Sequence, residues 1–247
     1  MIKLDRINKN YGTTRVIKDL SFEVQDKETL VLLGKSGCGK TTLLKMINRL
    51  IPLDSGNIYV DGTDIMDVNP IELRRSIGYV FQNIGLLPHY TIRRNLCVVP
   101  RLLKWDESRI KKQLEMVCDV LKIDKTYLQR MPRQLSGGQR QRIGVGRALM
   151  SNPNIVLMDE PFGALDPITR QDIQDEFSSL KHLINKTIVF VTHDVHEAFI
   201  LGDRICLMDG GNIAQIGTKK EILEQPANEF VEKFMAKYFA SLQQELA

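Results

Sequence analysis

The sequence has few cysteines and no long apolar run. Its 247 residues include four cysteines, and no two of them form a Cys-x-x-Cys pair or another zinc-binding spacing. This argues against a disulfide framework and favours a reducing, cytosolic compartment with free thiols. No apolar stretch approaches the length of a membrane span, and the N-terminus lacks the charged-then-apolar pattern of a signal peptide. If the chain serves a membrane, we expect it to act from outside the bilayer.

A strong excess of charge of one sign is also missing. The chain has 34 Lys and Arg against 30 Asp and Glu, a formal net charge of +4. That balance does not by itself indicate nucleic acid, and it is compatible with a position near an anionic membrane surface. Hydrophobic residues make up 43% and charged residues 26%, as in ordinary soluble globular proteins. The length suffices for one sizeable core, or for one core with a subdomain attached.

A glycine-rich turn stands between an aliphatic run and a helical pattern. The run at 29–33 is short and suits a buried strand. Residues 42–51 place apolar side chains on one face at helical spacing, namely Leu43, Ile47 and Leu50 or Ile51. Strand, turn and helix therefore follow in the order of a phosphate-binding P-loop. The turn consists of Gly34, Lys35, Ser36, Gly37, Cys38, Gly39, Lys40 and Thr41, and Thr42 comes next.

The residue types in this turn suit a nucleotide phosphate. Glycines let backbone N–H groups converge on a phosphate, and the start of the helix adds the positive end of its dipole. Lys40 can reach the β- and γ-phosphates, and the Thr41 hydroxyl can ligate Mg²⁺. The alternative is a glycine-rich connection with a stray lysine, which the two correct flanks disfavour.

Two consecutive carboxylates end a second aliphatic strand. Residues 154–158 lead directly into Asp159 and Glu160. Because adjacent residues at a strand end point differently, two roles are available. Asp159 fits the role of holding Mg²⁺ through its water shell, and Glu160 is then placed to polarise the water that attacks the γ-phosphate. A surface-exposed acidic turn closed by Pro161 is the weaker alternative beside an intact P-loop.

A third motif comprises Leu135, Ser136, Gly137, Gly138 and Gln139. Ser136 and Gln139 have the spacing of a capping box at a helix start, with the two glycines loosening the entry turn. A capped helix start with glycine amides is also an anion site, so both interpretations can hold together. The position downstream of a P-loop and just upstream of the acidic strand favours a functional motif.

Strand and helix patterns alternate along the rest of the chain. Strand patterns lie at 1–24 (parted by a turn at 10–12), 57–62, 77–81, 154–158, 187–191 and in a hairpin at 204–216. Helical patterns lie at 70–75, 109–121, 140–150, 167–182 and 229–246, with a capping box at 218–221 before the last of them. We therefore predict an α/β fold with a mostly parallel sheet and an inserted helical segment.

With these motifs in place, the chain resembles the nucleotide-binding subunit of an ABC transporter over nearly its whole length. The resemblance implies a P-loop NTPase (RecA-like) core, an N-terminal antiparallel β subdomain and an inserted α-helical subdomain. Residues 1–247 would form a single ATPase domain, with about 1–82 and 151–247 as β subdomain and core. About 83–150 would be the helical subdomain that carries the signature motif 135–139. We expect no C-terminal CBS modules.

The resemblance also implies roles for isolated residues. Tyr11 matches the aromatic residue that stacks on adenine, although a turn tyrosine beside a sheet edge would look the same. Gln82 matches the glutamine that contacts Mg²⁺ and water at the hinge to the helical subdomain. His193 matches the histidine that contacts the γ-phosphate, and the alternative is a histidine beside the helix cap Asp194.

Further family positions lie after the acidic strand and in the signature helix. The segment 164–166 matches the D-loop at the dimer interface, but Asp166 and Pro167 also fit a simple helix start. Gly146 stands where we expect alanine in the helix after the signature.

The implied site can be stated as one set of residues. Lys40, Glu160 and His193 are the predicted catalytic residues. The predicted ATP contacts are Tyr11, Gly34, Lys35, Ser36, Gly37, Cys38, Gly39, Lys40, Thr41, Thr42, Gln82, Ser136, Gly137, Gly138, Gln139 and Asp159. The predicted Mg²⁺ ligands are Thr41, Gln82 and Asp159.

The implied partners follow from the same resemblance. In an ATP-bound homodimer, each ATP would lie between the P-loop of one subunit and the signature motif of the other. Integral membrane permease subunits, and indirectly a substrate-binding protein, would complete the transporter on the cytoplasmic face of the cell membrane. We expect no nucleic-acid partner.

Residues 82–105 and 162–170 are similar to the ATPase subunits of bacterial osmoprotectant importers for glycine betaine, carnitine and choline. Importers for amino acids, sulfate and polyamines are the alternatives. A soluble ABC ATPase that acts on nucleic acid or ribosomes is a further alternative, although it would usually carry a coiled coil or a second cassette. A P-loop switch that binds nucleotide without hydrolysis is disfavoured by Glu160.

Overall fold

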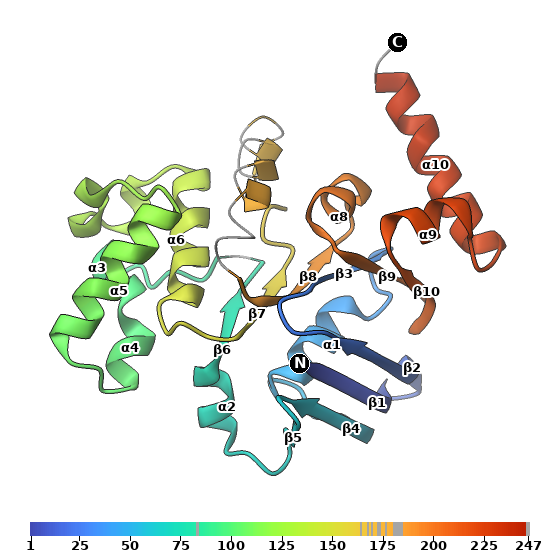
Figure 1. The fold of residues 1–247 in the computed structure, drawn as a ribbon, viewed down its shortest axis with the longest axis horizontal. Helices are drawn as coiled ribbons and strands as arrows, with labels where there is room; N and C mark the ends of the chain where they lie inside the picture. Colours follow the sequence, from blue (N-terminus) through green and yellow to red (C-terminus); the bar gives the residue numbers. More distant parts are fainter. Residues whose placement is uncertain are drawn as a thin grey trace. The chain divides into compact units, whose positions relative to one another are not determined.

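The computed structural model divides the chain into two compact units (Figure 1). The first unit comprises Met1–Asp67 and Val189–Ala247, and the second comprises Val68–Ile188. The structure describes all residues except 83, 164, 167, 169, 172–173, 176, 180–184 and 246–247, and it describes no side chains at 241–245.

An antiparallel sheet opens the first unit. Its strands are β1 (Ile2–Tyr11), β2 (Thr14–Val24), β4 (Ser55–Val60) and β5 (Thr63–Asp64), in the order β2-β1-β4-β5. The β1–β2 hairpin turns at Gly12, where φ is 57° and glycine avoids the cost of a left-handed backbone. Pairing is antiparallel throughout, which confirms the predicted N-terminal antiparallel subdomain.

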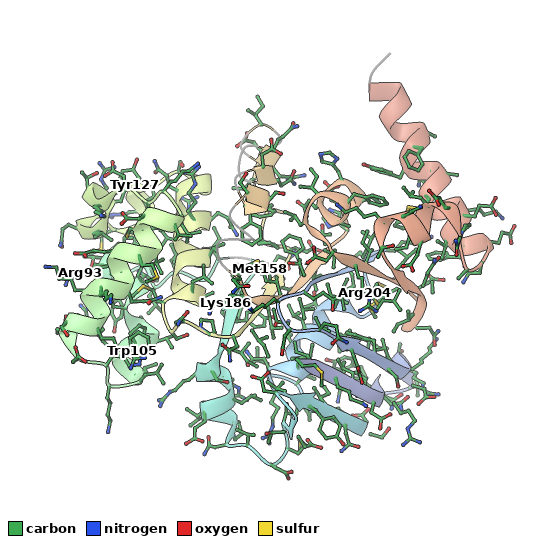
Figure 2. The ribbon with its side chains drawn as sticks, viewed as in Figure 1. Arg93, Trp105, Tyr127, Met158, Lys186 and Arg204 are labelled. Carbon is green, nitrogen blue, oxygen red and sulfur yellow. The ribbon has the colours of Figure 1, made fainter. Side chains whose placement is uncertain are left out.

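The first unit also contains the strand that precedes the P-loop. This strand, β3 (Thr29–Gly34), is buried along its whole length and pairs in parallel with β9 (Arg204–Asp209). The hairpin partner of β9 is β10 (Asn212–Gly217), and β8 (Thr187–Thr192) lies on the other side of β3. Arg204, the first residue of β9, donates a hydrogen bond to the carboxylate of Glu28, the residue before β3, at 3.1 Å (Figure 2).

Four described helices accompany these strands: α1 (Lys40–Ile47), α8 (Val195–Leu201), α9 (Lys219–Glu224) and α10 (Glu229–Glu245). Asp194 caps α8, and Thr218 with Glu221 forms the predicted capping box of α9. Among the described residues, no helix is both long and apolar enough to span a bilayer.

The helix after the P-loop is shorter than predicted. It ends at Ile47 with Asn48 as its C-cap, and Arg49 adopts a left-handed φ of 47°. Leu50 therefore lies outside the helix and is 43% exposed, so the prediction that it continues the buried face was wrong. Leu43 and Ile47 are buried as predicted.

The second unit combines a parallel strand pair with helices. Its strands β6 (Ile77–Val80) and β7 (Ile155–Asp159) are fully buried and pair in parallel. The described helices are α2 (Pro70–Ser76), α3 (Ile92–Leu96), α4 (Val98–Leu102), α5 (Glu107–Val120) and α6 (Gly137–Leu149), with short 3₁₀ turns η1 (Lys125–Gln129) and η2 (Pro132–Gln134). Parallel pairs in both units agree with the predicted α/β fold.

Two arginine side chains stack on aromatic rings in the helical part of this unit. The Arg109 guanidinium lies 3.6 Å from the centre of the Trp105 ring, and the Arg130 guanidinium lies 4.6 Å from the centre of the Tyr127 ring (Figure 2).

The predicted helix at 167–182 and the predicted D-loop at 164–166 fall partly outside the described residues.

Candidate nucleotide site

The P-loop turn leaves no room for side chains at two of its glycines. A Cβ at Gly34 would lie 2.4 Å from the Met208 carbonyl oxygen. A Cβ at Gly39 would lie 2.6 Å from Ile17 Cδ1, and φ at Gly39 is 105°. Both positions therefore require glycine, and the backbone of the turn packs directly on neighbouring elements.

Lys40 closes the turn from within. Its side chain is 5% exposed, and its Nζ donates to the carbonyls of Gly34 at 2.7 Å and Lys35 at 2.9 Å. The Cys38 Sγ lies 3.7 Å from the same nitrogen. The ammonium is thus held among backbone oxygens of the turn, where a phosphate would supply the opposite charge.

The first turn of α1 is suited to an anion. Gly39 is its N-cap, and among the described residues no side chain caps the helix and no acidic residue lies in its first turn. The positive end of the helix dipole is therefore not offset by a capping side chain or by a carboxylate in the first turn. The other predicted contacts are exposed or half-buried on this turn: Lys35, Ser36, Gly37, Thr41 and Thr42.

Tyr11 and His193 belong to the same unit as the P-loop. Tyr11 ends β1 and is 49% exposed, with the Lys9 ammonium 5.6 Å from its ring. His193 follows β8 directly and is exposed, next to Asp194, which accepts from the His196 N–H at 2.7 Å as the α8 cap. The capping interpretation is therefore confirmed for Asp194, while the His193 ring remains accessible.

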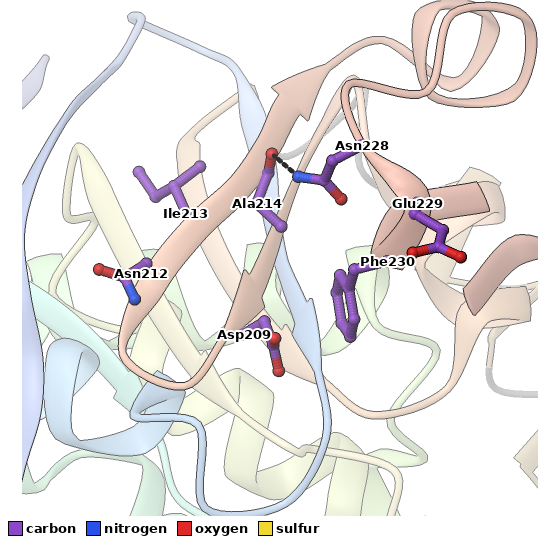
Figure 3. A pocket seen from close by; sticks show the side chains of 7 residues that line it. All are labelled: Asp209, Asn212, Ile213, Ala214, Asn228, Glu229 and Phe230. Carbon is purple, nitrogen blue, oxygen red and sulfur yellow. Dashed lines mark hydrogen bonds between the residues drawn. The ribbon is translucent and has the colours of Figure 1, made fainter. Parts of the chain in front are cut away.

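A pocket of about 330 Å³ lies beside the β9–β10 hairpin (Figure 3). Its wall includes Asn228, which donates to the Ala214 carbonyl at 3.4 Å, and Phe230, whose ring lies 5.8 Å from the Lys35 ammonium. The start of α10 is therefore in contact with the P-loop.

The predicted acidic pair lies in the second unit. Asp159 is the last residue of β7 and is 4% exposed. Glu160 adopts a left-handed φ of 43°, which turns the chain away from the strand direction. Its carboxylate accepts a hydrogen bond from the Gln82 amide at 3.1 Å. The structure therefore brings together two residues, 78 positions apart, that the sequence connects only through family resemblance.

Tyr79 is a neighbour of this pair that the sequence did not single out. Burial, and then the nearby Asp159 carboxylate, raise the pKa of Tyr79 above its ordinary value. Its ring centre lies 4.5 Å from that of Phe81. Strand alternation alone cannot tell such a tyrosine from an ordinary core residue.

The motif 135–139 forms the capping box that its spacing predicts. The Gln139 N–H donates to the Ser136 Oγ at 3.2 Å, and the Ser136 N–H donates to the Gln139 Oε1 at 2.8 Å. The Gln139 amide nitrogen also donates to the Tyr127 hydroxyl at 3.0 Å. Gly137 and Gly138 begin α6, so backbone N–H groups without side chains open this helix.

The three predicted Mg²⁺ ligands are distributed over the two units. Thr41 lies on α1 in the first unit, whereas Gln82 and Asp159 lie in the second. Within the described part of the chain, no cluster of three or more His, Cys, Asp or Glu residues has the arrangement of a metal site. Within the second unit, a metal ion at Asp159 would therefore also need amide, phosphate or water oxygens as ligands.

The model of the ABC transporter family matches residues 17–163. The chain is 52% identical over 238 residues to the glycine betaine/carnitine/choline transport ATP-binding protein OpuCA of Bacillus subtilis, covering 96% of this chain and 63% of that protein. It is 44% identical over 237 residues to the glycine betaine uptake system ATP-binding protein YehX of Escherichia coli, covering 96% and 77%.

The chain spans 60–63% of the length of the first curated relatives that it matches. Among solved structures, it is similar to the dimeric post-hydrolysis state of the ATP-binding cassette MJ0796 bound to ADP and Pi. The TM-score is 0.77 and the identity 31%, covering 88% of this chain and 98% of that one. For cbiO1 from Clostridium perfringens, the TM-score is 0.82 and the identity 26%, covering 91% and 90%.

Proposed function

The chain belongs to the ABC transporter family, and on that premise we propose that it is the ATP-hydrolysing subunit of an importer for quaternary-amine osmoprotectants. The observation that carries the proposal is the 52% identity, across 96% of this chain, to a glycine betaine/carnitine/choline transport ATP-binding protein. The same solute class appears in the names of a choline relative and an osmoprotectant relative at 50% and 47% identity.

The P-loop is suited to bind a nucleoside triphosphate. Its turn excludes side chains at Gly34 and Gly39, and its buried Lys40 is surrounded by carbonyl oxygens. In our proposal the Lys40 ammonium exchanges these contacts for the β- and γ-phosphates, whose negative charge it offsets. Tyr11, half-exposed at the end of β1, offers its ring to adenine.

Glu160 is the proposed general base. The Gln82 amide donates to its carboxylate, which orients the side chain that would accept a proton from water. His193 is exposed at the end of β8 and would contact the γ-phosphate. Mg²⁺, held by oxygens of Thr41, Gln82 and Asp159, would neutralise phosphate charge when bound.

The proposed active form is a homodimer. The similar cassette MJ0796 is described as a dimer. In our chain, the capped start of α6 presents the N–H groups of Gly137 and Gly138 beside the Ser136 hydroxyl, a set of donors without a phosphate-binding lysine. A second copy would supply that lysine, so each site would combine the P-loop of one subunit with residues 136–139 of the other.

The remaining proposed partners are integral permease subunits and, through them, a substrate-binding protein. The protein would lie at the cytoplasmic face of the membrane, and we expect no nucleic-acid partner. Importers of amino acids, sulfate or polyamines would use a similar ATPase, because this subunit does not contact the solute.

The test is uptake by the assembled transporter. The chain, purified from its native membrane with its associated integral subunits, would be reconstituted into vesicles containing ATP. We expect uptake of labelled glycine betaine, carnitine or choline that depends on internal ATP. Uptake of an amino acid, sulfate or a polyamine instead would overturn the solute assignment. Recovery of the chain with ribosomes or DNA, without membrane subunits, would overturn the transport function.

A further inference from the structure

One arginine of the signature helix binds the segment that follows Gln82. Arg147 lies in the last turn of α6, and its Nη1 and Nη2 donate to the carbonyls of Gly85 at 2.6 Å and Ile84 at 2.7 Å. Burial lowers the pKa of this guanidinium, although it stays charged. Among the described carboxylates, none forms an ion pair with it. Both Nη atoms therefore donate to backbone carbonyls of one short segment.

The segment that Arg147 binds has an unusual backbone. Ile84 has φ of 48° and Gly85 has φ of 60°, so two successive residues are left-handed. This conformation is disfavoured for a β-branched residue such as isoleucine and must be held by its surroundings. The guanidinium satisfies the two carbonyls that this conformation directs toward α6.

A glycine of the same helix makes room for the segment. A Cβ at Gly144 would lie 2.8 Å from Ile84 Cγ2. Gly144 and Arg147 are three residues apart and therefore lie on one face of α6. The helix thus accommodates the Ile84 side chain at one position and binds its carbonyl at the next turn.

The bound segment leads directly to the proposed general base. The Ile84 N–H donates to the carbonyl of Phe81, the residue before Gln82, at 2.9 Å. The Gln82 amide in turn donates to the Glu160 carboxylate at 3.1 Å. All of these residues belong to the second unit, so the sequence of contacts runs within one compact body.

We propose that Arg147 is a positioning residue, which holds Ile84 and Gly85 so that the Gln82 amide stays on the Glu160 carboxylate. This inference rests on the proposed function, because it concerns the orientation of the base in ATP hydrolysis. The α6 helix begins with the Ser136 cap and carries Arg147 near its end. The signature motif and Arg147 therefore lie on the same helix.

Steady-state ATP hydrolysis by the purified chain tests the inference. Arg147→Lys keeps the charge but replaces the planar guanidinium, which donates from two separate nitrogens, by a single ammonium, and Arg147→Ala removes both donors. We expect each variant to lower kcat at least tenfold while KM for ATP changes less than threefold, because the P-loop contacts are untouched. Gly144→Ala should lower kcat in the same direction by displacing Ile84. Arg133→Ala, at an exposed arginine of η2, is the matched control and should leave kcat unchanged.

A double-variant comparison separates positioning from general loss of structure. If Arg147 acts through Glu160, Arg147→Ala should reduce the residual rate of a Glu160→Gln chain less than twofold. A loss of equal size in both backgrounds would overturn the inference. Wild-type kcat in Arg147→Lys and Arg147→Ala, or losses fully explained by their unfolding, would also overturn it. If the wild-type chain does not hydrolyse ATP, the proposed function fails as well, which distinguishes the two results.

Discussion

At the scale of single residues, Glu160 is the proposed general base. It follows a fully buried strand, adopts a left-handed backbone and accepts from Gln82. We expect Glu160→Gln to lower the turnover number for ATP by about 10²–10⁴-fold, because an amide cannot take the proton of the attacking water. Binding of a fluorescent ATP analogue should stay within a few-fold of wild type, since the P-loop is unchanged.

The matched control for this substitution is Glu115→Gln on α5. Glu115 is exposed and lies in the same unit, so the change in formal charge is identical. Both variants would be assayed for phosphate release at saturating ATP. Normal turnover in Glu160→Gln would remove this residue from the base role.

Gly39 allows a second test at residue scale. Gly39→Ala adds a Cβ 2.6 Å from the fully buried Ile17 side chain, at a φ of 105°. We expect a loss of about 2 kcal/mol in the free energy of unfolding, together with loss of nucleotide binding. Urea unfolding and titration with the ATP analogue measure the two effects.

Gly62→Ala separates strain from steric contact. Gly62 also has a positive φ, 81°, but a Cβ added there would meet no described atom within 4 Å beyond its two chain neighbours. It should lose only about 1 kcal/mol and keep nucleotide binding. Equal effects of the two substitutions would argue that the packing of the P-loop turn against Ile17 is unimportant.

Sequence reasoning at this scale found residues that belong to local patterns. The capping pair Ser136 and Gln139 and the strand that ends at Asp159 could be predicted from spacing alone. Tyr79 and Arg147 could not, because their significance depends on contacts with distant residues. Arg147 lies 62 residues from Gly85, and nothing in the helical pattern around it indicates that partner.

At the scale of elements, hydrogen-bonded caps help to determine where the helices begin. Asp106 caps α5, accepting from the Ser108 hydroxyl at 2.5 Å and from the Arg109 N–H at 2.8 Å. These hydrogen bonds lower the pKa of Asp106 below its ordinary value of 3.8. Because the folded pKa is the lower one, this contribution to stability is present above the unfolded pKa and is lost as pH falls through the folded pKa.

We therefore expect acid to weaken the wild-type chain more than an Asp106→Asn chain. Asparagine is also a good N-cap but does not titrate, so the two chains should have similar urea midpoints at about pH 6. At about pH 3 the wild-type midpoint should fall further than that of the variant. Parallel declines in the two chains would show that the Asp106 cap does not contribute to the acid response.

Most elements could be predicted because their signals are local. Proline at the start of α2 and the capping boxes of α6 and α9 mark helix starts that the structure confirms. The end of α1 was misjudged, because Leu50 and Ile51 continue the apolar spacing after Arg49 has already left the helical conformation. Periodicity detects a helix but does not detect the residue at which the backbone turns away.

At the scale of the whole molecule, the proposed site is completed by a second copy. This can be tested by mixing two inactive chains. In Lys40→Ala the P-loop lacks its cation, and in Ser136→Arg the signature motif is blocked. If each site combines these elements from different subunits, a mixed dimer has one site with both defects and one intact site. We expect the mixture to recover measurable ATP hydrolysis that neither variant shows alone.

The control is a mixture of Lys40→Ala with a chain that carries both substitutions. Every dimer in that mixture lacks an intact site, so activity should stay at background. Recovery there as well would point to contamination, and absence of recovery in the first mixture would argue against the reciprocal arrangement.

The extent of the ATPase domain and of its helical subdomain, predicted as about 83–150, stays a prediction.

The burial of the thiols has a practical consequence. Cys38, Cys97, Cys118 and Cys206 are all buried, and burial raises the pKa of Cys118 to about 11 and that of Cys206 to about 12. Buried thiols react slowly with maleimides. A cysteine introduced at an exposed position such as Gln129 would therefore take up a fluorophore selectively, without prior removal of the native cysteines. The folded chain is thus ready for single-site labelling in its natural sequence background.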